Sequence, residues 1–432
     1  MRRSVLAILA ALPLAAPAGA AEDWPNWRGP HGNGAGEASG LPESWSRTAG
    51  VRWSAPLPGA CASTPAVVRD RVYVSSLDDA TRELVALAFD RATGRELWRK
   101  VVGMNTRTWK LNPGLVNNMA SCSPVADGER AVFLFGSGDL AAFDPDGAPL
   151  WARNLAKDHG PFVHLWGYGA SPLLHDGRLY VPILRRDQPY EGRRLEKPLD
   201  SLLLLIDPKT GKDLVRHVRP TNAKDEAKDA YGTPVLRTDG GRPEIVLLGG
   251  DCLTGHDPAT GTELWRWDGW NPARIGIWRI IPSALAAEGH LYVATPKKGP
   301  VFAVRPSGTG WTVAWQTKEV TPDVCTPLYY RNRVYVLDGD RKLLIGFDPK
   351  TGETKCSVTP PGKEAFRASP TAADGKIFCM NEDGTASVLA PDDLRILGTA
   401  EMGDRPCRAS IAPAGRHLYI RTAKTLHCVG AP

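Results

Sequence analysis

Aromatic and cationic side chains gather in four segments that separate apolar runs, and their chemistry suits the binding of a ligand. The segments span residues 103–120, 156–169, 219–232 and 270–281. The first three are longer than most loops of compact domains, which is typical of loops that carry function or an interaction surface. The candidate binding residues in and near these segments are Trp109, His164, Trp166, Tyr168, Tyr231, Arg274, Trp278, Arg279, Asp323 and Arg367.

The mixture of aromatic rings and guanidinium groups favours an extended polymer as the ligand. Side chains of this kind suit an extended peptide, the edge strand of a partner protein, or a polysaccharide. All four segments precede an inner strand of the repeats described below, so we expect them to converge on one face of the molecule. The alternative interpretation, that each residue only packs its loop against the body of the protein, stays open for every one of them.

The sequence contains none of the common catalytic motifs. A Gly-x-Ser-x-Gly nucleophile turn is missing, as are a phosphate-binding loop and a His-Glu-x-x-His zinc pair. The nine histidines are scattered without the spacing of metal ligands. Many acidic residues lie in predicted turns, where their side chains cap the backbone. We therefore assign no catalytic residue and no metal ligand, although two carboxylates from different repeats could still form a glycosidase-like pair.

An apolar strand followed by Asp-x-x-Thr-Gly, and in most copies by a Trp, recurs along the chain. Copies of this phrase, some of them degenerate, occupy residues 88–98, 142–151, 205–215, 255–265 and 346–356. The Asp side chain is expected to cap the turn, and the Gly to take the left-handed conformation that the turn requires. An internal repeat of this length indicates a propeller or a solenoid.

A second phrase sets the number of repeats: Ser or Thr, in most copies followed by Pro, then a strand, a polar turn and another strand. Its two β-rich runs joined by a tight turn are typical of a hairpin, and the Asp-x-x-Thr-Gly turn then joins a third strand to a fourth. Four antiparallel strands form one propeller blade. We therefore expect an all-β fold, an eight-bladed β-propeller of four-stranded antiparallel blades. The copies of the phrase begin at residues 63, 122, 170, 232, 282, 325, 368 and 409.

The two ends of the chain are expected to share the last blade. The last repeat stops one strand short, and residues 50–59 resemble an outer strand. An N-terminal strand would complete that blade and remove the exposed sheet edges. On the outer strands an indole ring can wedge between neighbouring sheets, and Val215 and Cys356 hold this position in two weaker copies. The tryptophans assigned to this structural role are Trp53, Trp98, Trp151, Trp265 and Trp315.

Three regions are expected along the chain. Residues 1–20 have the charged start, apolar centre and small-residue end of an export signal cleaved near Ala20. Residues 21–49 form an arm rich in Trp, Gly and Pro that packs on the propeller through its two N-terminal tryptophans, and residues 50–432 form the single propeller. Because no stretch is long enough to span a membrane, we expect a protein of the periplasm or the cell surface.

Charge and cysteine content limit the class of partner. The net charge is +6 for 432 residues and no basic stripe is present, so nucleic acid is not an expected partner. Eight cysteines in an exported chain are able to form disulfides. Cys61 and Cys407 hold matching positions in the first and last repeats, where a bridge would close the ring, and buried free thiols are the alternative. We expect a monomer whose partner is an envelope protein or a polysaccharide.

The repeats resemble those of quinoprotein-like propellers, whose blades carry pyrroloquinoline-quinone (PQQ) type repeats with the same Asp-x-x-Thr-Gly-x-x-x-Trp pattern. The resemblance covers essentially all of the chain after the export signal. The segments DWPNWRGPHGNG, HLWGYGASP, WRIIPS and VLDGDRKLL are similar to those of exported PQQ-like propellers of planctomycete-type bacteria. A better-known member is the propeller lipoprotein of the outer-membrane β-barrel assembly machinery (BamB), a noncatalytic scaffold whose lipidated Cys has no counterpart near the expected cleavage site.

The resemblance implies more than one function. In quinoprotein alcohol dehydrogenases the propeller axis holds PQQ and calcium, with a carboxylate as general base and a disulfide between adjacent cysteines. No two cysteines are adjacent here, and no Cys-x-x-Cys-His haem segment is present. We therefore expect a noncatalytic exported scaffold that binds proteins or envelope polymers through one propeller face without a cofactor. The alternatives are a PQQ- and calcium-dependent dehydrogenase and a carbohydrate-active enzyme with carboxylates in the channel.

Overall fold

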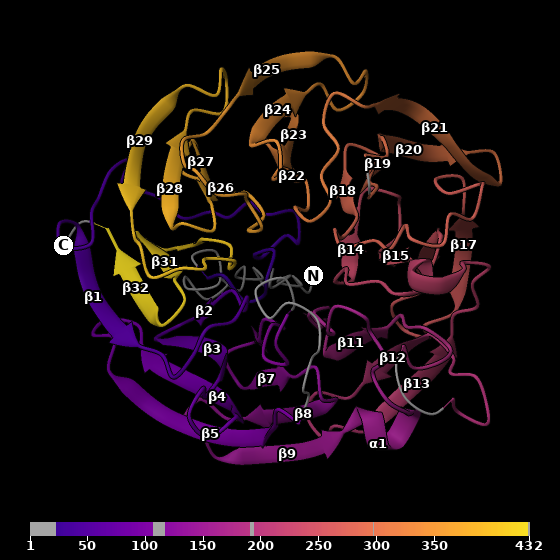
Figure 1. Cartoon of the computed structure of the whole chain (residues 1–432), viewed down its shortest axis with the longest axis horizontal. Coiled ribbons are helices and arrows are strands. Elements are labelled where there is room, and N and C mark those ends of the chain that lie inside the picture. Colours follow the sequence, from indigo (N-terminus) through magenta and orange to yellow (C-terminus); the bar gives the residue numbers. More distant parts are fainter. Residues whose placement is uncertain (1–22, 107–116, 191–193, 297, 431–432) are drawn as a thin grey trace, which may run out of the picture.

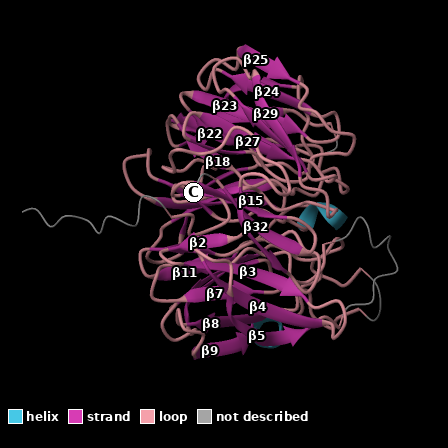
Figure 2. Ribbon diagram, turned by 90° about the vertical axis from the view of Figure 1, so that its left-hand side faces the viewer, coloured by secondary structure: helices cyan, strands magenta, loops and turns pink. Residues whose placement is uncertain are grey.

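Eight four-stranded antiparallel sheets stand around a central axis and form a closed ring (Figure 1). The structure, a computed structural model, describes residues 23–106, 117–190, 194–296 and 298–430. The expected eight-bladed β-propeller is confirmed. The predicted export signal at 1–20 lies outside the described residues. Seen from the side, the strands cross the thickness of the disc and loops cover its two faces (Figure 2).

The strands of each blade follow one another from the axis outward. Blades 1 to 4 comprise β2 (Ala66–Val68), β3 (Arg71–Leu77), β4 (Glu83–Asp90) and β5 (Glu96–Met104); β6 (Val125–Ala126), β7 (Ala131–Leu134), β8 (Asp139–Phe143) and β9 (Pro149–Asn154); β10 (Leu173–His175), β11 (Arg178–Ile183), β12 (Leu202–Ile206) and β13 (Asp213–Val218); β14 (Val235–Arg237), β15 (Glu244–Gly249), β16 (Cys252–His256) and β17 (Glu263–Trp267).

Blades 5 to 8 repeat the order, and the last one takes its outer strand from the start of the chain. They comprise β18 (Leu285–Ala287), β19 (His290–Ala294), β20 (Val301–Ser307) and β21 (Gly310–Thr317); β22 (Leu328–Tyr330), β23 (Arg333–Asp338), β24 (Leu343–Phe347) and β25 (Thr354–Val358); β26 (Thr371–Ala373), β27 (Lys376–Met380), β28 (Thr385–Leu389) and β29 (Ile396–Glu401); β30 (Ala412–Ala414), β31 (His417–Arg421), β32 (Thr425–Val429) and β1 (Val51–Pro56). Within the described ranges, two short helices, α1 (Leu155–His159) and η2 (Asp225–Lys228), lie in the loops.

Sequence pattern separates the middle strands from the outer ones. The third strand of a blade is apolar on both faces because it packs between two neighbouring sheets; all five residues of β12, Leu-Leu-Leu-Leu-Ile, are buried. The outer strand β13 has no residue that is fully buried, and it presents alternate side chains to solvent. The core is therefore a series of apolar layers between blades, such as the one that joins β7 and β8 to β11 and β12.

The Asp-x-x-Thr-Gly turns have the predicted geometry. In the turn of blade 1, Asp90 accepts hydrogen bonds from the backbone N–H groups of Ala92 and Thr93, and Gly94 has a φ of 72°. Next to this turn the pairing of β4 with β5 shifts register between Ala88 and Phe89, opposite Trp98 and Glu96, and equivalent shifts occur in the other blades that pair a third strand with such an outer strand. A β-bulge redirects the side chain that follows it, which here turns the tryptophan toward the next blade.

Four of the five assigned tryptophans bond to the turn of the next blade. The indole N–H donates to the carbonyl of the residue directly after the turn Asp, and the turn Gly lies against the ring; a Cβ on Gly94 would lie 2.5 Å from Trp53. The bonds join Trp53 to Arg91, Trp98 to Pro145, Trp151 to Pro208 and Trp315 to Pro349, at 2.8–3.1 Å.

Trp265 is the exception among these tryptophans. Its indole N–H donates to Glu244 in its own blade at 2.9 Å, and its ring stacks on Trp311 of blade 5 with centroids 4.2 Å apart. The reason is that blade 5 joins β20 to β21 by a tight turn at Gly308 instead of the Asp-x-x-Thr-Gly turn, so no equivalent carbonyl is present. The residue still fills an interface between blades, but by aromatic stacking.

Tyrosine replaces the missing tryptophan in the two weaker copies. Blade 3 carries Val215 on its outer strand, and the hydroxyl of Tyr180 on β11 donates to the carbonyl of Pro258 in the next turn at 2.7 Å. In blade 6, Tyr335 on β23 makes the same bond to Pro391 at 2.6 Å. A second-strand tyrosine thus keeps the inter-blade bond where the tryptophan is missing, and in blade 5 Tyr292 on β19 makes this bond to Pro349 beside that of Trp315.

The ring closes by strand pairing and not by a disulfide. β1 pairs antiparallel with β32 as predicted, with Trp53 opposite Cys428. Cys61 and Cys407 are both free thiols, so the bridge considered between them is wrong for this structure. The junction is instead reinforced by Arg421, which is completely buried and donates to backbone carbonyls of blade 1, among them that of Gly59 at 3.0 Å.

Residues 23–49 lie as an ordered arm across one face of the ring. The buried Trp24 exchanges two 2.8 Å backbone hydrogen bonds with Val67 at the inner strand of blade 1. Further along, the N–H of Gly36 donates to the carbonyl of Ala372 in blade 7, and that of Ser39 to Gly415 in blade 8. Between these points the carbonyl of Pro25 accepts from Ala126 in blade 2 and that of Asn33 from Tyr329 in blade 6, so the arm crosses the ring and covers one end of the channel. No helix among the described residues has the length and apolar character to cross a membrane.

Candidate functional site

The Ser or Thr of the second repeated phrase lines the central channel. In every blade it lies just before the inner strand, and in all but one its backbone N–H donates to the hydroxyl of the equivalent residue in the next blade. Seven of these eight bonds are present among the described residues, at 2.8–3.0 Å. The missing one leaves the buried hydroxyl of Ser410 without a partner. The members of this hydroxyl ring are Thr64, Ser123, Ser171, Thr233, Ser283, Thr326, Ser369 and Ser410.

A second ring lies two residues earlier in each repeat. Because the chain enters every blade in the same way, these side chains also face the channel, and they vary around the axis. Blades 1 to 3 contribute small residues, blades 4 to 6 bulky ones and blades 7 and 8 arginines. The members are Ala62, Ser121, Gly169, Tyr231, Ile281, Val324, Arg367 and Arg408.

Two connected cavities follow the axis. The outer one, which we call the mouth, has a volume of about 260 Å³ and is lined by the loops that precede the inner strands, including Trp166 and Arg279. The inner one, the shaft, has a volume of about 110 Å³ and lies at the level of the hydroxyl ring. Tyr231, Arg367 and other residues line both cavities, so they are continuous. Trp27 of the arm lines the shaft at the other end, so the arm forms its floor.

Arg279 organises one side of the mouth. Its guanidinium is 7 % exposed and forms ion pairs with Asp323 at 3.0 Å and with Glu226 at 3.2 Å. It also lies over the ring of Trp166, 5.6 Å from the centroid. The indole N–H of Trp166 in turn donates to Glu226 at 2.7 Å. These contacts tie four different loops together and hold the Trp166 ring at the mouth.

Arg367 and Arg408 form the opposite side. Arg367 pairs with Asp340 at 2.8 Å and approaches Glu382 at 3.8 Å, while Arg408 donates to Glu382 at 2.6 Å. Counting both sides, three arginines face four carboxylates. Because the charges are nearly balanced, the mouth has no strong net field for a highly charged ligand.

A buried carboxylate, Asp229, connects the mouth loops from below. It is fully buried and accepts hydrogen bonds from the backbone N–H groups of Leu165 at 3.0 Å and Arg186 at 3.1 Å. Burial raises its pKa to about 7, against the opposing effect of those two hydrogen bonds. The carboxyl thus links the loop that carries Trp166 to the loop that carries Tyr231.

The predicted binding residues separate into groups. Trp166, Tyr231, Arg279, Asp323 and Arg367 come together at the mouth. The remaining four described candidates do not line it. His164 and Tyr168 are buried behind it, bonded to the carbonyls of Leu184 and Pro182; Arg274 pairs with Asp268; and Trp278 packs against the apolar cluster of blades 4 and 5. Trp109 lies outside the described residues.

Sequence reasoning missed Asn117, Glu226, Asp340, Glu382 and Arg408. Arg408 was detectable, because it stands two residues before the Ser of its repeat as Arg367 does. Ile281 and Val324 obey the same spacing. Asp340 and Glu382 gave no such signal, since both lie in hairpin turns where an acidic residue is common.

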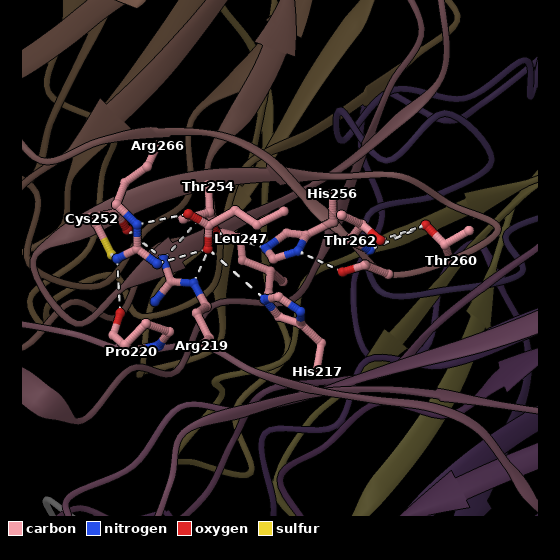
Figure 3. Close-up of polar contacts among 12 residues, drawn as sticks. His217, Arg219, Pro220, Leu247, Cys252, Thr254, His256, Thr260, Thr262 and Arg266 are labelled. Atoms are coloured by element: carbon pink, nitrogen blue, oxygen red, sulfur yellow. Dashed lines mark hydrogen bonds and ion pairs between the residues drawn. The ribbon is translucent and has the colours of Figure 1, made fainter.

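A second polar cluster, between blades 3 and 4, is structural (Figure 3). Arg219 is 1 % exposed and donates to the hydroxyl of Thr254 and to the carbonyls of Gly249 and Cys252, each at 2.8 Å. His256 lies beside it, and burial lowers its pKa to about 4. None of these residues lines the mouth or the shaft, so we infer that the cluster holds the two sheets together.

Fold and cavity together define an eight-bladed propeller with a channel open at one face. The chain matches the family model described as outer membrane protein assembly factor BamB over residues 44–181 and 249–413, which is more than half of its length. It therefore belongs to this family of PQQ-like propellers. No curated protein matches it.

Solved structures show the same fold at low sequence identity. Quinohemoprotein alcohol dehydrogenase from Comamonas testosteroni has a TM-score of 0.70 and 13 % identity, covering 96 % of this chain and 81 % of its own. BamB from Moraxella catarrhalis has a TM-score of 0.62 and 15 % identity, covering 88 % and 99 %. A europium-containing methanol dehydrogenase has a TM-score of 0.66 and 11 % identity, covering 93 % and 90 %. These likenesses concern the fold alone, and they include both enzymes and an assembly factor.

The residues at the mouth do not fit a calcium–quinone centre. Calcium takes six to eight oxygen ligands, whereas Glu226 and Asp323 are held by Arg279, and Asp340 and Glu382 by Arg367. A cation placed between either pair would have to displace a guanidinium. Among the described residues no three His, Cys, Asp or Glu side chains group as metal ligands, and their cysteines are free. We therefore propose no reaction that uses calcium and a quinone.

Proposed function

We propose that this protein is a noncatalytic exported propeller that binds a segment of a partner polypeptide through the mouth. The observation that supports this most directly is the convergence of Trp166, Tyr231 and Arg279 from three loops on one cavity of about 260 Å³. Trp, Tyr and Arg are the residues that contribute most to protein interfaces. An arrangement of paired charges around aromatic rings suits a polypeptide, which offers both donors and acceptors.

The loop that supplies Arg279 to the mouth also carries exposed apolar side chains. Ile275 and Ile277 are 37 % and 59 % exposed and belong to the loop that ends in Arg279. The carbonyl of Gly276 between them accepts a 2.7 Å hydrogen bond from Ala227, which holds the loop against η2. Exposed apolar residues on a well-held loop, next to a polar cavity, favour a protein partner over a water-soluble sugar.

The family description agrees with this proposal, since it names an assembly factor. Catalysis has less support, because each of the four mouth carboxylates is engaged by an arginine and none is set apart as an acid or a base. The proposal includes export, which residues 1–20 predict, and binding of the partner in the cell envelope.

Site-specific photo-cross-linking tests the proposal. A photoreactive amino acid at position 277 is expected to give a light-dependent protein adduct in the source envelope. The same group at Val101, which is 56 % exposed on the outer strand β5, is the matched control and is expected to give none. Trp166→Ala combined with Arg279→Ala should remove the adduct while the folded protein keeps its far-ultraviolet spectrum. Equal labelling at both positions, or only a polysaccharide adduct at 277, would contradict a polypeptide-binding mouth.

A further inference from the structure

The shaft is a blind pocket. Each inner strand runs from the mouth toward the arm: in blade 7, Arg367 lines the mouth, Ser369 lies in the hydroxyl ring, and Ala372 bonds to the arm. Trp27 lines the shaft from the arm side. The neighbouring Arg28 is 3 % exposed and donates to the carbonyls of Pro370 and Pro327, which fixes the arm over the channel. A polypeptide that enters from the mouth therefore has no exit.

The wall of the shaft is chemically divided. Arg367 and Arg408 come from blades 7 and 8, while Tyr231, Ile281 and Val324 come from blades 4 to 6. A ligand that fills the shaft thus meets cations on one side and apolar surface on the other. The volume of about 110 Å³ equals roughly three to four water molecules at about 30 Å³ each. This is room for one small terminal residue and not for a folded segment.

Two groups at the shaft have donors for an anion. The Ser410 hydroxyl is buried, lines the shaft and has no partner. Arg367 lines both cavities, and its nearest carboxylate partner, Asp340, has a side chain that is 57 % exposed. Exposed ion pairs contribute little, so an incoming carboxylate is able to replace Asp340 on Arg367. A carboxylate matches the planar fork of a guanidinium and forms two parallel bonds with it.

We propose that the shaft captures the C-terminal carboxylate of a polypeptide whose last residue is small and apolar. The carboxylate lies against Arg367 and Arg408 and accepts a hydrogen bond from the Ser410 hydroxyl. The side chain of the last residue contacts Ile281 and Val324. Recognition of a chain end follows from the blind floor, because an internal stretch of chain would have to leave through Trp27. This inference rests on the proposed function and narrows it to one kind of peptide.

Paired peptide libraries test chain-end capture. Acetylated hexapeptides with five randomised positions and a final Ala are prepared as free acids and as carboxamides, and retention on the immobilised protein, residues 21–432, is compared by mass spectrometry. We expect the free acids to be retained at least about tenfold better, which corresponds to 1.4 kcal/mol. A third library, with an internal Glu and a carboxamide end, asks whether a side-chain carboxylate suffices.

Three substitutions sharpen the readout. Arg367→Gln is expected to lower retention of the free acids to the level of the amides. Asp340→Asn should leave it unchanged or raise it, because it removes the competing carboxylate. Arg341→Gln is the matched control: this arginine directly follows Asp340 in the β23–β24 turn of blade 6, has a side chain that is 52 % exposed, and lines neither cavity. Melting temperatures of all three variants show whether each one is folded.

The outcomes separate this inference from the proposed function. Equal retention of acids and amides, or retention of the Glu library alone, would overturn chain-end capture and leave a polypeptide-binding mouth. The same holds if no library is retained while position 277 cross-links to a protein. If neither experiment shows binding, both proposals fail. Free-acid retention that survives Arg367→Gln would also overturn the assigned site.

Discussion

The two faces of the ring close the same channel in different ways. On the arm face the contacts are backbone hydrogen bonds and buried side chains: Trp24 has no exposed surface, and Arg28 bonds to carbonyls of blades 6 and 7. On the mouth face the contacts are ion pairs: those of Arg279 are largely buried, whereas Arg367 pairs with Asp340, whose side chain is 57 % exposed. Backbone pairing and apolar burial resist change, whereas exposed ion pairs exchange partners at little cost. The difference indicates a structural floor and an adaptable entrance.

The largest expected effect comes from removing a tryptophan of the floor. Trp24→Ala should lower the free energy of unfolding by about 4 kcal/mol, as for other buried tryptophans. Trp166→Ala at the mouth should lower it by less than about 1 kcal/mol and still abolish partner binding. Urea titrations of both variants, with cross-linking at position 277, measure the contrast. Similar losses of stability would show that the two faces are not built differently.

A pH titration distinguishes the buried carboxyl under the mouth from the rest of the molecule. Because the folded pKa of Asp229 is about 7 and its ordinary value is 3.8, the folded state binds the proton more tightly. Its contribution to stability is full below about pH 4 and is lost as the pH rises through 7. The loss is at most about 4 kcal/mol at 1.36 kcal/mol per unit.

The Asp229→Asn variant isolates this effect, because other groups titrate equally in both proteins. The wild-type free energy of unfolding, minus that of the variant, should fall between pH 4 and pH 8 in urea titrations. His256 and His427, whose pKa values are lowered to about 4, change stability in the opposite sense and cancel in the difference. A difference that is constant with pH would mean that Asp229 titrates normally.

Removal of the buried guanidinium of Arg28 in the arm is expected to have an intermediate effect on stability. Arg28→Met leaves the carbonyls of Pro327 and Pro370 without their donor, and we expect a loss of about 2 kcal/mol. Arg395→Met, at an arginine whose side chain is 67 % exposed, is the control, with an expected change within about 0.5 kcal/mol. Thermal unfolding of the two variants gives the comparison. Equal melting temperatures would argue that Arg28 does not hold the arm against the propeller.

The smallest effect concerns two serines of the hydroxyl ring. Ser369→Ala removes the acceptor of the Thr326 N–H and should lower stability by about 1 kcal/mol. Ser410→Ala removes a hydroxyl that has no partner, so stability should stay the same while capture of carboxylate peptides weakens. Calorimetric unfolding and peptide retention are measured on both. A larger loss for Ser410→Ala than for Ser369→Ala would reverse the roles given to them.

Much of the fold was readable from the repeats, while the site was readable only in part. The Asp-x-x-Thr-Gly turns and the shared last blade follow from local pattern, because turn chemistry depends on a few adjacent residues. Trp265 behaves differently from the other outer-strand tryptophans because the next blade lacks the turn that would receive it. His164 looks like a ligand in sequence and is a buried donor to the carbonyl of Leu184. Periodicity alone does not contain such neighbour effects.

The sequence by itself determined the blade count, the strand order and the places where loops are long, because each depends on residues close together in the chain. It also indicated the closure of the ring, because the last repeat stops one strand short and residues 50–59 resemble an outer strand, although β1 and β32 lie at opposite ends of the chain. It also contained the spacing that places Arg367 and Arg408 on the channel, two residues before the serines. Only the tertiary structure decided that Arg279 meets Glu226 and Asp323, and that Trp27 closes the shaft. Those contacts join residues from different blades, and it is the closing of the ring that brings them within reach of one another.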